Sequence, residues 1–456
     1  MKKKTVLILL FILLLTTTTS GDLKKRSAEN PKIAKIITEI SPRNIETIIK
    51  KLVSFHTRHT LSDQESEAVG IGAAARWIKA EFDRYSQESG NRLKVELDET
   101  TVGPAPRIPK ATKLTNIVAT LPGTKPESSD RIYVVSGHYD SRASDPLDAK
   151  SFAPGANDDA SGTAAVMEMA RVMSKYEFDA TLVFMAVAGE EQGLHGSTHW
   201  AEMAKERKLN IEGMITNDII GSSKDENGHI NRNEVRLFAE GLSVTSQTPA
   251  DLRTTIQTGG ENDTPTRQLA RRIKELAEEH IVGMKVTIIY RRDRYLRGGD
   301  HSPFLDRGYP AVRMSEPNED YKHQHQDVRK EGNVQYGDLP EFVDYQYVAR
   351  VARVNAAALA GLALAPAPPK KVEVETINLE NSTTLRWEAN QEADLAGYQI
   401  VWRETTAPNW QKKLFVGNVT RYTVKGISKD NYLFGVQAVD KDGNRSLAVY
   451  PKPYRQ

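Results

Sequence analysis

The sequence of 456 residues contains no cysteine. This absence excludes disulfide bonds, cysteine nucleophiles and zinc sites built from thiolates, so any metal site must use His, Asp and Glu. An excess of charge is also absent, because 62 Lys and Arg residues face 60 Asp and Glu residues, giving a formal net charge of +2. A nucleic-acid-binding protein would carry a basic excess. Nucleic acid is therefore not an expected partner, whereas small molecules, peptides and proteins are.

The N-terminus has the pattern of a segment that directs export. Lys2–Lys4 precede an apolar run, Val6–Leu15, and small residues follow at Thr16–Gly21. This order is typical of a secretory signal peptide, which we place at residues 1–20. The apolar run is shorter than the roughly 20 residues that span a bilayer, so no membrane association is expected after cleavage. We therefore expect a secreted or periplasmic protein.

The next part of the chain alternates between strand and helix patterns. Strands, most of them continuous apolar runs, are predicted at Leu93–Leu97, Thr115–Thr120, Ile132–Ser136, Thr181–Ala188, Met214–Ile219, Val235–Ala239, Val286–Tyr290 and Ala311–Met314. Apolar residues at helical spacing predict helices at 32–54, Ala68–Tyr85, Gly162–Tyr176, His195–Glu206, Thr266–His280 and Glu341–Ala363. This order predicts an α/β domain, residues 21–363, whose mostly parallel, twisted sheet is flanked by helices.

The last part of the chain has a different pattern. A Pro-rich linker at residues 364–371 precedes short strand patterns without helical periodicity, which predict a small all-β sandwich at residues 372–456 with Trp387 in its core. The segments PPKKVEVE, TTLRWEAN, LAGYQIVWR and YLFGVQAVDKDGNRS resemble a fibronectin type III domain. The resemblance implies a role in binding, spacing or stability, with another protein or a polysaccharide as the expected partner of this domain.

Polar residues follow several of the predicted strands of the α/β domain. His138 and Asp140 come directly after the strand at 132–136, Asp158 lies in PGANDDASG, and Glu190 and Glu191 end the strand at 181–188. A polar turn, a helix cap or a solvated acidic loop would explain each of these patterns alone. Two adjacent glutamates at the end of a buried strand, however, are costly unless a cation lies beside them.

Further candidates come later in the chain. Asp218 lies inside an apolar run at 216–221, and His323, His325 and Asp327 follow the strand at 311–314. Because ligands bind outside the carboxyl ends of the strands in open α/β sheets, we expect these side chains to converge. Nitrogen and oxygen ligands without thiolate suit zinc, with Mn²⁺ or Co²⁺ as alternatives. Five ligands and a spare carboxylate fit two ions about 3.5–4 Å apart that share one carboxylate.

Six motifs in order over residues 40–363 resemble the co-catalytic zinc aminopeptidase family, which includes bacterial leucyl aminopeptidase and plasma glutamate carboxypeptidase. The motifs are SGHYDS, PGANDDASG, GEEQGLHGS, NDIIG, GGDHSPFLDRGYPAV and HQHQD. The resemblance implies a zinc-exopeptidase fold that binds two Zn²⁺ ions. It also implies hydrolysis of the N-terminal peptide bond of peptide substrates with a free N-terminus.

The same resemblance implies the metal ligands. His138 and Asp218 would hold one metal, Glu191 and His323 would hold the other, and Asp158 would bridge them.

The remaining roles also come from the resemblance. Glu190 would be the general base, and Asp140 would orient the metal-bound His138. His325 competes with His323 for the last ligand position, and we choose His323 because the family pattern His-x-x-x-Asp is satisfied by His323 with Asp327.

Other activities remain open on the same motifs. Glutaminyl cyclases share the scaffold and several motifs but use one zinc. A dipeptidase or carboxypeptidase would need a basic residue for the substrate carboxylate, and Arg291, Arg292 and Arg297 lie in a suitable segment. A binding protein built on an inactive peptidase scaffold would not need to keep all the predicted ligands and Glu190. Their presence therefore argues against this alternative. We therefore expect a secreted, monomeric metallo-aminopeptidase.

Overall fold

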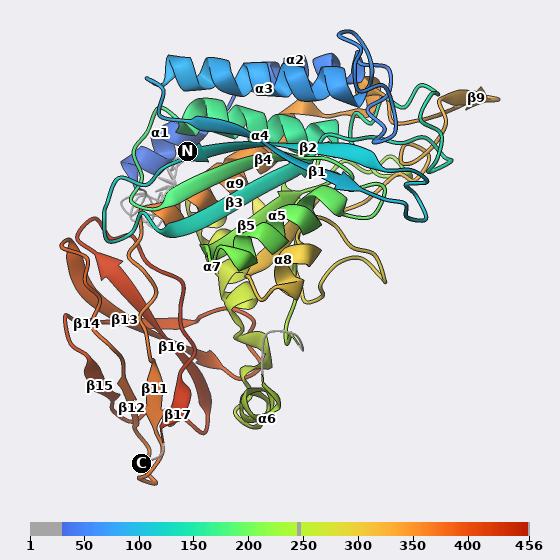
Figure 1. Cartoon of the computed structure of the whole chain (residues 1–456). Helices are drawn as coiled ribbons and strands as arrows, with labels where there is room; N and C mark the ends of the chain where they lie inside the picture. Colours follow the sequence, from blue (N-terminus) through green and yellow to red (C-terminus); the bar gives the residue numbers. More distant parts are fainter. Residues whose placement is uncertain (1–29, 244–247, 455–456) are drawn as a thin grey trace, which may run out of the picture.

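The structure is a computed structural model that describes residues 30–243 and 248–454 (Figure 1). The predicted signal peptide at residues 1–20 lies outside the described residues. Within the two described ranges, no helix has both the length and the apolar character that crossing a membrane requires.

Eight strands form one mixed sheet in the order β1-β2-β4-β3-β5-β8-β6-β7. Their bounds are β1 (Lys94–Val102), β2 (Thr112–Leu121), β3 (Arg131–His138), β4 (Thr181–Val187), β5 (Asn210–Asn217), β6 (Glu234–Ala239), β7 (Lys285–Ile289) and β8 (Ala311–Ser315). The central strands β4, β3, β5 and β8 are parallel, as are β6 and β7. The pairings β1–β2, β2–β4 and β6–β8 are antiparallel. The predicted α/β sheet is confirmed, with a parallel centre and antiparallel pairings on either side.

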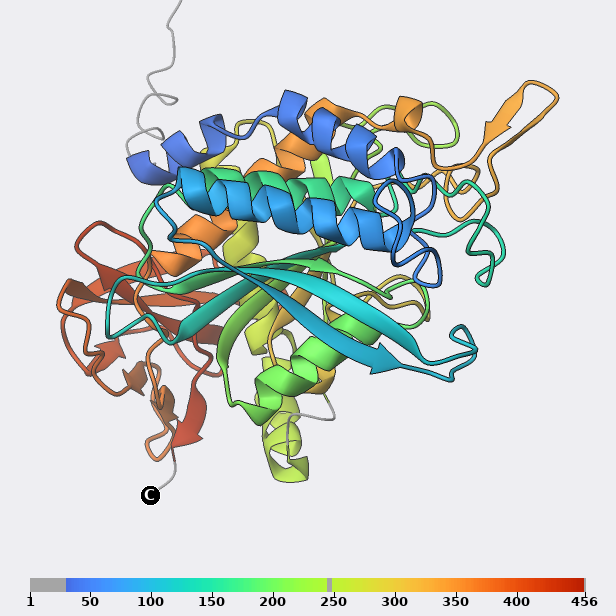
Figure 2. The same ribbon diagram turned by 45° about the horizontal axis from the view of Figure 1, so that its top comes forward.

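Helices cover both faces of this sheet (Figures 1 and 2). Their bounds are α1 (Pro31–Thr38), α2 (Pro42–Val53), α3 (Gly70–Glu88), α4 (Ala160–Met173), α5 (His195–Glu206), α6 (Pro249–Gln257), α7 (Pro265–His280), α8 (Ser302–Asp306) and α9 (Tyr345–Ala363). The single helix predicted at 32–54 is in fact two helices. Pro42 cannot donate a backbone hydrogen bond to a preceding helical turn, and Ser41 caps the new helix by accepting the N–H of Asn44 at 3.3 Å.

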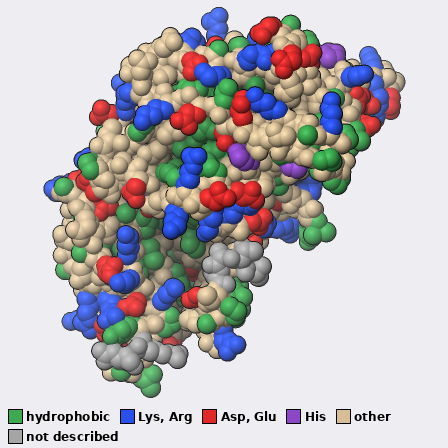
Figure 3. Space-filling view, in the orientation of Figure 1, with side chains coloured by type: hydrophobic (Ala, Val, Ile, Leu, Met, Phe, Trp, Pro, Cys, Tyr) green, Lys and Arg blue, Asp and Glu red, His purple; other side chains and the backbone are tan. Residues whose placement is uncertain are grey.

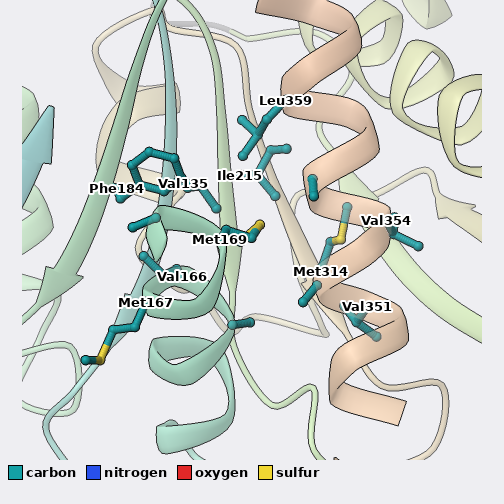
Figure 4. Close-up of a cluster of buried hydrophobic side chains, with 14 of the residues drawn as sticks. Val135, Val166, Met167, Met169, Phe184, Ile215, Met314, Val351, Val354 and Leu359 are labelled. Carbon is teal, nitrogen blue, oxygen red and sulfur yellow. The ribbon is translucent and has the colours of Figure 1, made fainter. Parts of the chain in front are cut away.

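Two buried apolar clusters occupy the two faces of the sheet. On one face, Val135 and Phe184 of the sheet pack with helices α4 and α9, as Figure 4 shows for Met169 and Leu359. On the other face, neighbouring strand residues such as Val134 pack against α5 and α8. Successive strand residues point to opposite faces, so strands covered on both sides are continuously apolar, which made them predictable.

The C-terminal strands form two further sheets, β15-β12-β11-β17 and β14-β13-β16. Their bounds are β11 (Glu373–Glu375), β12 (Thr383–Arg386), β13 (Leu395–Glu404), β14 (Lys412–Gly417), β15 (Arg421–Val424), β16 (Tyr432–Asp440) and β17 (Lys452–Tyr454). Trp387 is buried in their shared core with Tyr398 and Phe434, as predicted for Trp387. A short hairpin, β9 (Arg329–Glu331) with β10 (Val334–Tyr336), projects from the α/β part.

The parallel strands position the polar segments. Strands β3, β4, β5 and β8 point the same way, so their carboxyl ends lie at one edge of the sheet. His138 is the last residue of β3, and Asp218 comes directly after β5. The segments that carry the remaining candidate residues begin at or near this edge. On the outer surface, Figure 3 shows acidic and basic side chains intermixed over the face in view, in keeping with the balanced charge.

Candidate metal centre

His138 is buried at the end of β3, with 1% of its surface exposed. Its Nε2 atom forms no hydrogen bond within the described residues. The same atom lies 3.1 Å from Oδ1 of Asp158 and 3.9 Å from Oδ1 of Asp218. A buried imidazole nitrogen without a hydrogen bond calls for an explanation such as an ion. Its position beside two carboxylates fits a metal cation.

Asp158 belongs to two groups of potential ligands. Its Oδ1 faces His138, and its Oδ2 lies 2.9 Å from Nε2 of His325. That nitrogen is also 2.9 Å from Oε1 of Glu191. One group is His138, Asp158 and Asp218, and the other is Asp158, Glu191 and His325; within each, the ligand atoms lie within 4.8 Å of one another. The structure therefore brings together two adjacent three-ligand groups that share one carboxylate.

His323, which we predicted as a ligand, does not belong to either group. Its ring stacks on Phe342 with 3.5 Å between the ring centroids, and its Nδ1 lies 3.4 Å from Oδ2 of Asp320. The structure does not support the choice of His323, because His325 occupies the position beside Glu191.

The turn around His325 explains why the structure differs from this choice. His325 has a φ of 51°, in the left-handed region, and the spacing of residues in a motif does not reveal which side chain such a turn directs into a site. Asp327, which supported the choice of His323, accepts the N–H of Ser144 at 3.1 Å.

Asp140 contacts two of the segments that carry candidate residues. Its Oδ1 lies 3.5 Å from Nδ1 of His138, in keeping with the predicted orienting role. Its two carboxylate oxygens also accept the backbone N–H groups of Glu190, at 3.3 Å, and of Glu191, at 3.1 Å. A single carboxylate thus fixes both the histidine after β3 and the pair of glutamates after β4. The two bonds to the glutamates were not predicted from the sequence.

Two acidic residues that were not predicted from the sequence, Asp338 and Asp159, fix the segment that carries Asp158 through hydrogen bonds. Asp338 accepts the N–H groups of Asn157, at 2.8 Å, and of Asp158, at 2.7 Å. Asp159 caps α4 by accepting the N–H of Gly162, and it accepts the N–H of His138 as well, both at 3.0 Å. Asp159 is adjacent to a predicted ligand in the sequence, but Asp338 lies 180 residues away and no motif marks it.

Arg58 links three segments near the site through hydrogen bonds to their backbone carbonyl groups. It is fully buried and donates to the carbonyl groups of Tyr139 and Pro154, both at 2.6 Å, and of Gly155, at 2.9 Å. A fourth bond reaches Leu52 at the end of α2. These bonds fix the segment after β3 against the segment that leads to Asp158.

The site holds more negative than positive charge. Burial opposes protonation of His138, yet Asp140 and Asp158 raise its pKa well above the usual value. Burial also opposes protonation of His325, but Glu191 and Asp158 raise its pKa to about 10. The carboxylates therefore stabilise positive charge at both histidines. Since metal ligands must be deprotonated, cations binding here would displace these protons.

Glu190 lies beside the ligands but belongs to neither group. Burial, together with the negative charges of Asp218 and Glu191, raises the pKa of Glu190 well above its usual value. Asp300 is close enough to contribute to this rise, and burial raises the pKa of Asp300 itself to about 6. A carboxyl group whose pKa is raised in this way is suited to accept a proton and return it.

Comparison with known protein families shows to which family the chain belongs. The model of "Peptidase family M28" matches residues 116–344, which contain both ligand groups, and the fibronectin type III domain model matches residues 367–451. The chain belongs to peptidase family M28. This confirms the predicted family, the peptide-hydrolase class and the fibronectin type III resemblance.

Relatives of this M28 chain cover nearly its whole length. A protein of Leptosphaeria maculans named as a probable zinc metalloprotease is 49% identical over 429 residues, which are 94% of this chain and 98% of the relative. A protein of Pyrenophora tritici-repentis with the same description is 49% identical over 421 residues, 92% of this chain and 86% of the relative.

Solved structures share the M28 fold at low sequence identity. The Legionella pneumophila LapA aminopeptidase matches with a TM-score of 0.52 and 18% identity over 80% of each chain. LapB from the same organism matches with a TM-score of 0.51 and 18% identity, over 75% of this chain and 80% of LapB. These similarities support the fold.

Proposed function

We propose that this M28 chain is an aminopeptidase that uses two zinc ions to hydrolyse the N-terminal peptide bond of peptides. The observation that carries the proposal is the position of Asp158, whose two oxygens face His138 and His325. The Nε2 atom of His138, which forms no hydrogen bond within the described residues, and the surplus of carboxylates fit cations at both groups. The names of the relatives favour zinc, and the donor set also accepts Mn²⁺ or Co²⁺.

Each group of residues has a defined task in this mechanism. His138, Asp158 and Asp218 would hold one ion, and Asp158, Glu191 and His325 the other. Two bound zinc ions would supply Lewis-acid chemistry, because they lower the pKa of a water molecule and polarise the substrate carbonyl. A carboxylate oxygen of Glu190 accepts a proton from the water molecule while the water oxygen forms a bond to the carbonyl carbon. Glu190 then returns the proton to the amine nitrogen as the carbon–nitrogen bond breaks.

The charge of the site favours substrates with a free N-terminus. An α-amino group is a cation, and Glu190, Asp218 and Asp300 place carboxylates in the same buried region. The arginines that would favour recognition of a substrate carboxylate are engaged elsewhere or exposed. Arg292 pairs with Asp306 at 2.6 Å, and Arg291 lies over the ring of Tyr295.

A panel of aminoacyl-arylamides tests the proposal, on protein whose zinc content has been counted. We expect two zinc ions per chain, release of arylamine, loss of activity with a chelator and recovery with added zinc. Peptides with an acetylated N-terminus should not be cleaved. Cleavage of such blocked peptides from the C-terminus would indicate a carboxypeptidase. One zinc per chain with cyclisation of N-terminal glutamine, and no arylamine, would indicate a glutaminyl cyclase.

We also propose that the enzyme is exported, on the basis of the pattern at residues 1–20. Sequencing the N-terminus of the mature protein from the culture medium or periplasm tests this proposal. Retention of Met1 on a cytoplasmic protein would contradict it.

A further inference from the structure

Arg313 of β8 lies directly behind one of the ligand groups. The residue is fully buried, and its Nη2 atom lies 2.9 Å from Oδ1 of Asp218. This is the oxygen that faces His138 on its other side, at 3.9 Å. The same Nη2 donates to the backbone carbonyl of Asp218 at 3.4 Å. Arg313 therefore fixes both the side chain and the backbone of this ligand.

The other end of the guanidinium group contacts a different segment. Nη1 of Arg313 lies 3.1 Å from Oδ2 of Asp293, and it donates to the carbonyl oxygen of Gly298, also at 3.1 Å. Both residues belong to segment 290–301, which connects β7 to α8. Asp293 in turn lies 3.7 Å from Nε2 of His301 in the same segment.

The same segment approaches the ligand itself. A Cβ atom added to Gly299 would lie 3.3 Å from Oδ2 of Asp218 and 3.3 Å from Nη1 of Arg313. Gly299 is thus packed against both groups, and Asp300 follows it in the site. A displacement of the segment would therefore move Asp218, and a displacement of Asp218 would move the segment.

We propose that Arg313 is a positioning residue that couples the ligand Asp218 to segment 290–301. A cation held by His138, Asp158 and Asp218 then stabilises the packed segment, and the packed segment strengthens binding of that cation, because such coupling is reciprocal. The inference rests on the metal centre proposed above. The planar guanidinium suits this task, since it presents separate nitrogens to Asp218 and Asp293, which a lysine cannot do.

Metal titration of metal-free protein, combined with hydrogen exchange of peptides from segment 290–301, tests the coupling. In the wild type we expect two binding steps for zinc, and the step that disappears in Asp218→Ala should slow exchange in the segment. In Arg313→Met this step should weaken about 10- to 100-fold, as for other residues that orient ligands, while the other step stays unchanged. Zinc should then no longer slow exchange in the segment.

Two further variants separate positioning from folding. Arg313→Lys keeps the charge without the planar group, and it should restore part of the lost affinity. Asp293→Asn leaves the pair of Arg313 and Asp218 in place, so the zinc step should weaken less than in Arg313→Met while the slowing of exchange is lost. These two variants carry the test if Arg313→Met does not fold.

Arg272→Met is the matched control, because Arg272 is a buried arginine of α7 whose carboxylate partner is Glu275 at 3.2 Å. Both zinc steps and the exchange response should stay as in the wild type. Equal weakening of both steps in Arg313→Met, or an unchanged exchange response, would overturn the role of Arg313. Wild-type protein that binds no zinc would instead contradict the proposed function.

Discussion

Asp158 is the residue that most directly indicates two metal ions at this site. A carboxylate with one histidine is common on protein surfaces, but Asp158 is buried and each of its oxygens faces a different histidine. Because the two histidines come from segments far apart in the sequence, no local structural role accounts for both contacts. The arrangement instead fits one carboxylate shared between two cations.

Glu190→Gln tests the proton transfer. The amide keeps the shape of the side chain but cannot accept the proton, so kcat should fall by about 10²–10⁴-fold. Zinc content should remain at two per chain, since Glu190 belongs to neither ligand group. Arylamide kinetics and metal analysis on the same preparation measure both quantities.

Glu206→Gln is the control for this experiment, because Glu206 is the exposed last residue of α5. Its activity and its zinc content should equal those of the wild type. Full activity in Glu190→Gln would show that another group moves the proton.

The two neighbouring histidines give a direct comparison. His325→Ala removes a ligand atom beside Glu191 and Asp158, so zinc content after dialysis should fall from two towards one per chain. His323→Ala removes a ring stacked on Phe342 and should retain both ions. Metal analysis of the two variants in parallel decides between them, and loss of zinc only in His323→Ala would restore the choice made from the sequence.

The sequence predicted most of the residues that the structure brings together. His138, Glu191 and Asp218 could be found because each is a polar residue at or near the end of an apolar strand, and Asp158 because it lies in the motif PGANDDASG. Their role as ligands remains a prediction. His325 could not be distinguished from its neighbour, because the choice depends on a turn in the left-handed region.

At the scale of elements, the candidate metal centre depends on segments that are fixed by hydrogen bonds to their backbone. Asp338→Asn tests one of them, since the amide can no longer accept the N–H groups of both Asn157 and Asp158. We expect zinc affinity to fall about 10- to 100-fold while the folded structure is retained. Competition with a chelator of known affinity measures the change.

Asp63→Asn is the matched control, because Asp63 also accepts two backbone N–H groups, those of Glu65 and Ser66, but in an exposed turn. Its zinc affinity should not change. An equal loss in both variants would mean that the effect is not specific to the segment of Asp158.

The elements that the sequence did not predict lack the necessary pattern. All eight strands of the large sheet were predicted, and the central ones, such as β3 and β4, stand out as apolar runs covered on both faces. Helix α6 has no buried residue, so it shows no apolar face, and α8 has only five residues. Strands β9 and β10 also escaped prediction, because each is only three residues long.

At the scale of the whole molecule, the fibronectin type III domain is held against the M28 domain by buried polar contacts. Asp263, which is fully buried, pairs with Arg271 of α7 at 2.8 Å and with Arg403 of β13 at 2.6 Å. Arg271 also donates to the carbonyl of Pro408, and Trp410 donates to Gln268 at 3.2 Å. Of the roles expected for this domain, the contacts favour stability of the whole chain.

Arg403→Met tests this interpretation by removing one partner of a buried ion pair. Breaking such a pair costs about 3–5 kcal/mol, and we expect the low end because Arg271 still pairs with Asp263. Calorimetry should show one unfolding transition for the wild type, and for the variant a lower midpoint with separate transitions for the two domains. In the control Arg421→Met, loss of an exposed pair with Glu375 should cost less than about 1 kcal/mol. Equal midpoints for the two variants would show that the domains are stable independently of their contact.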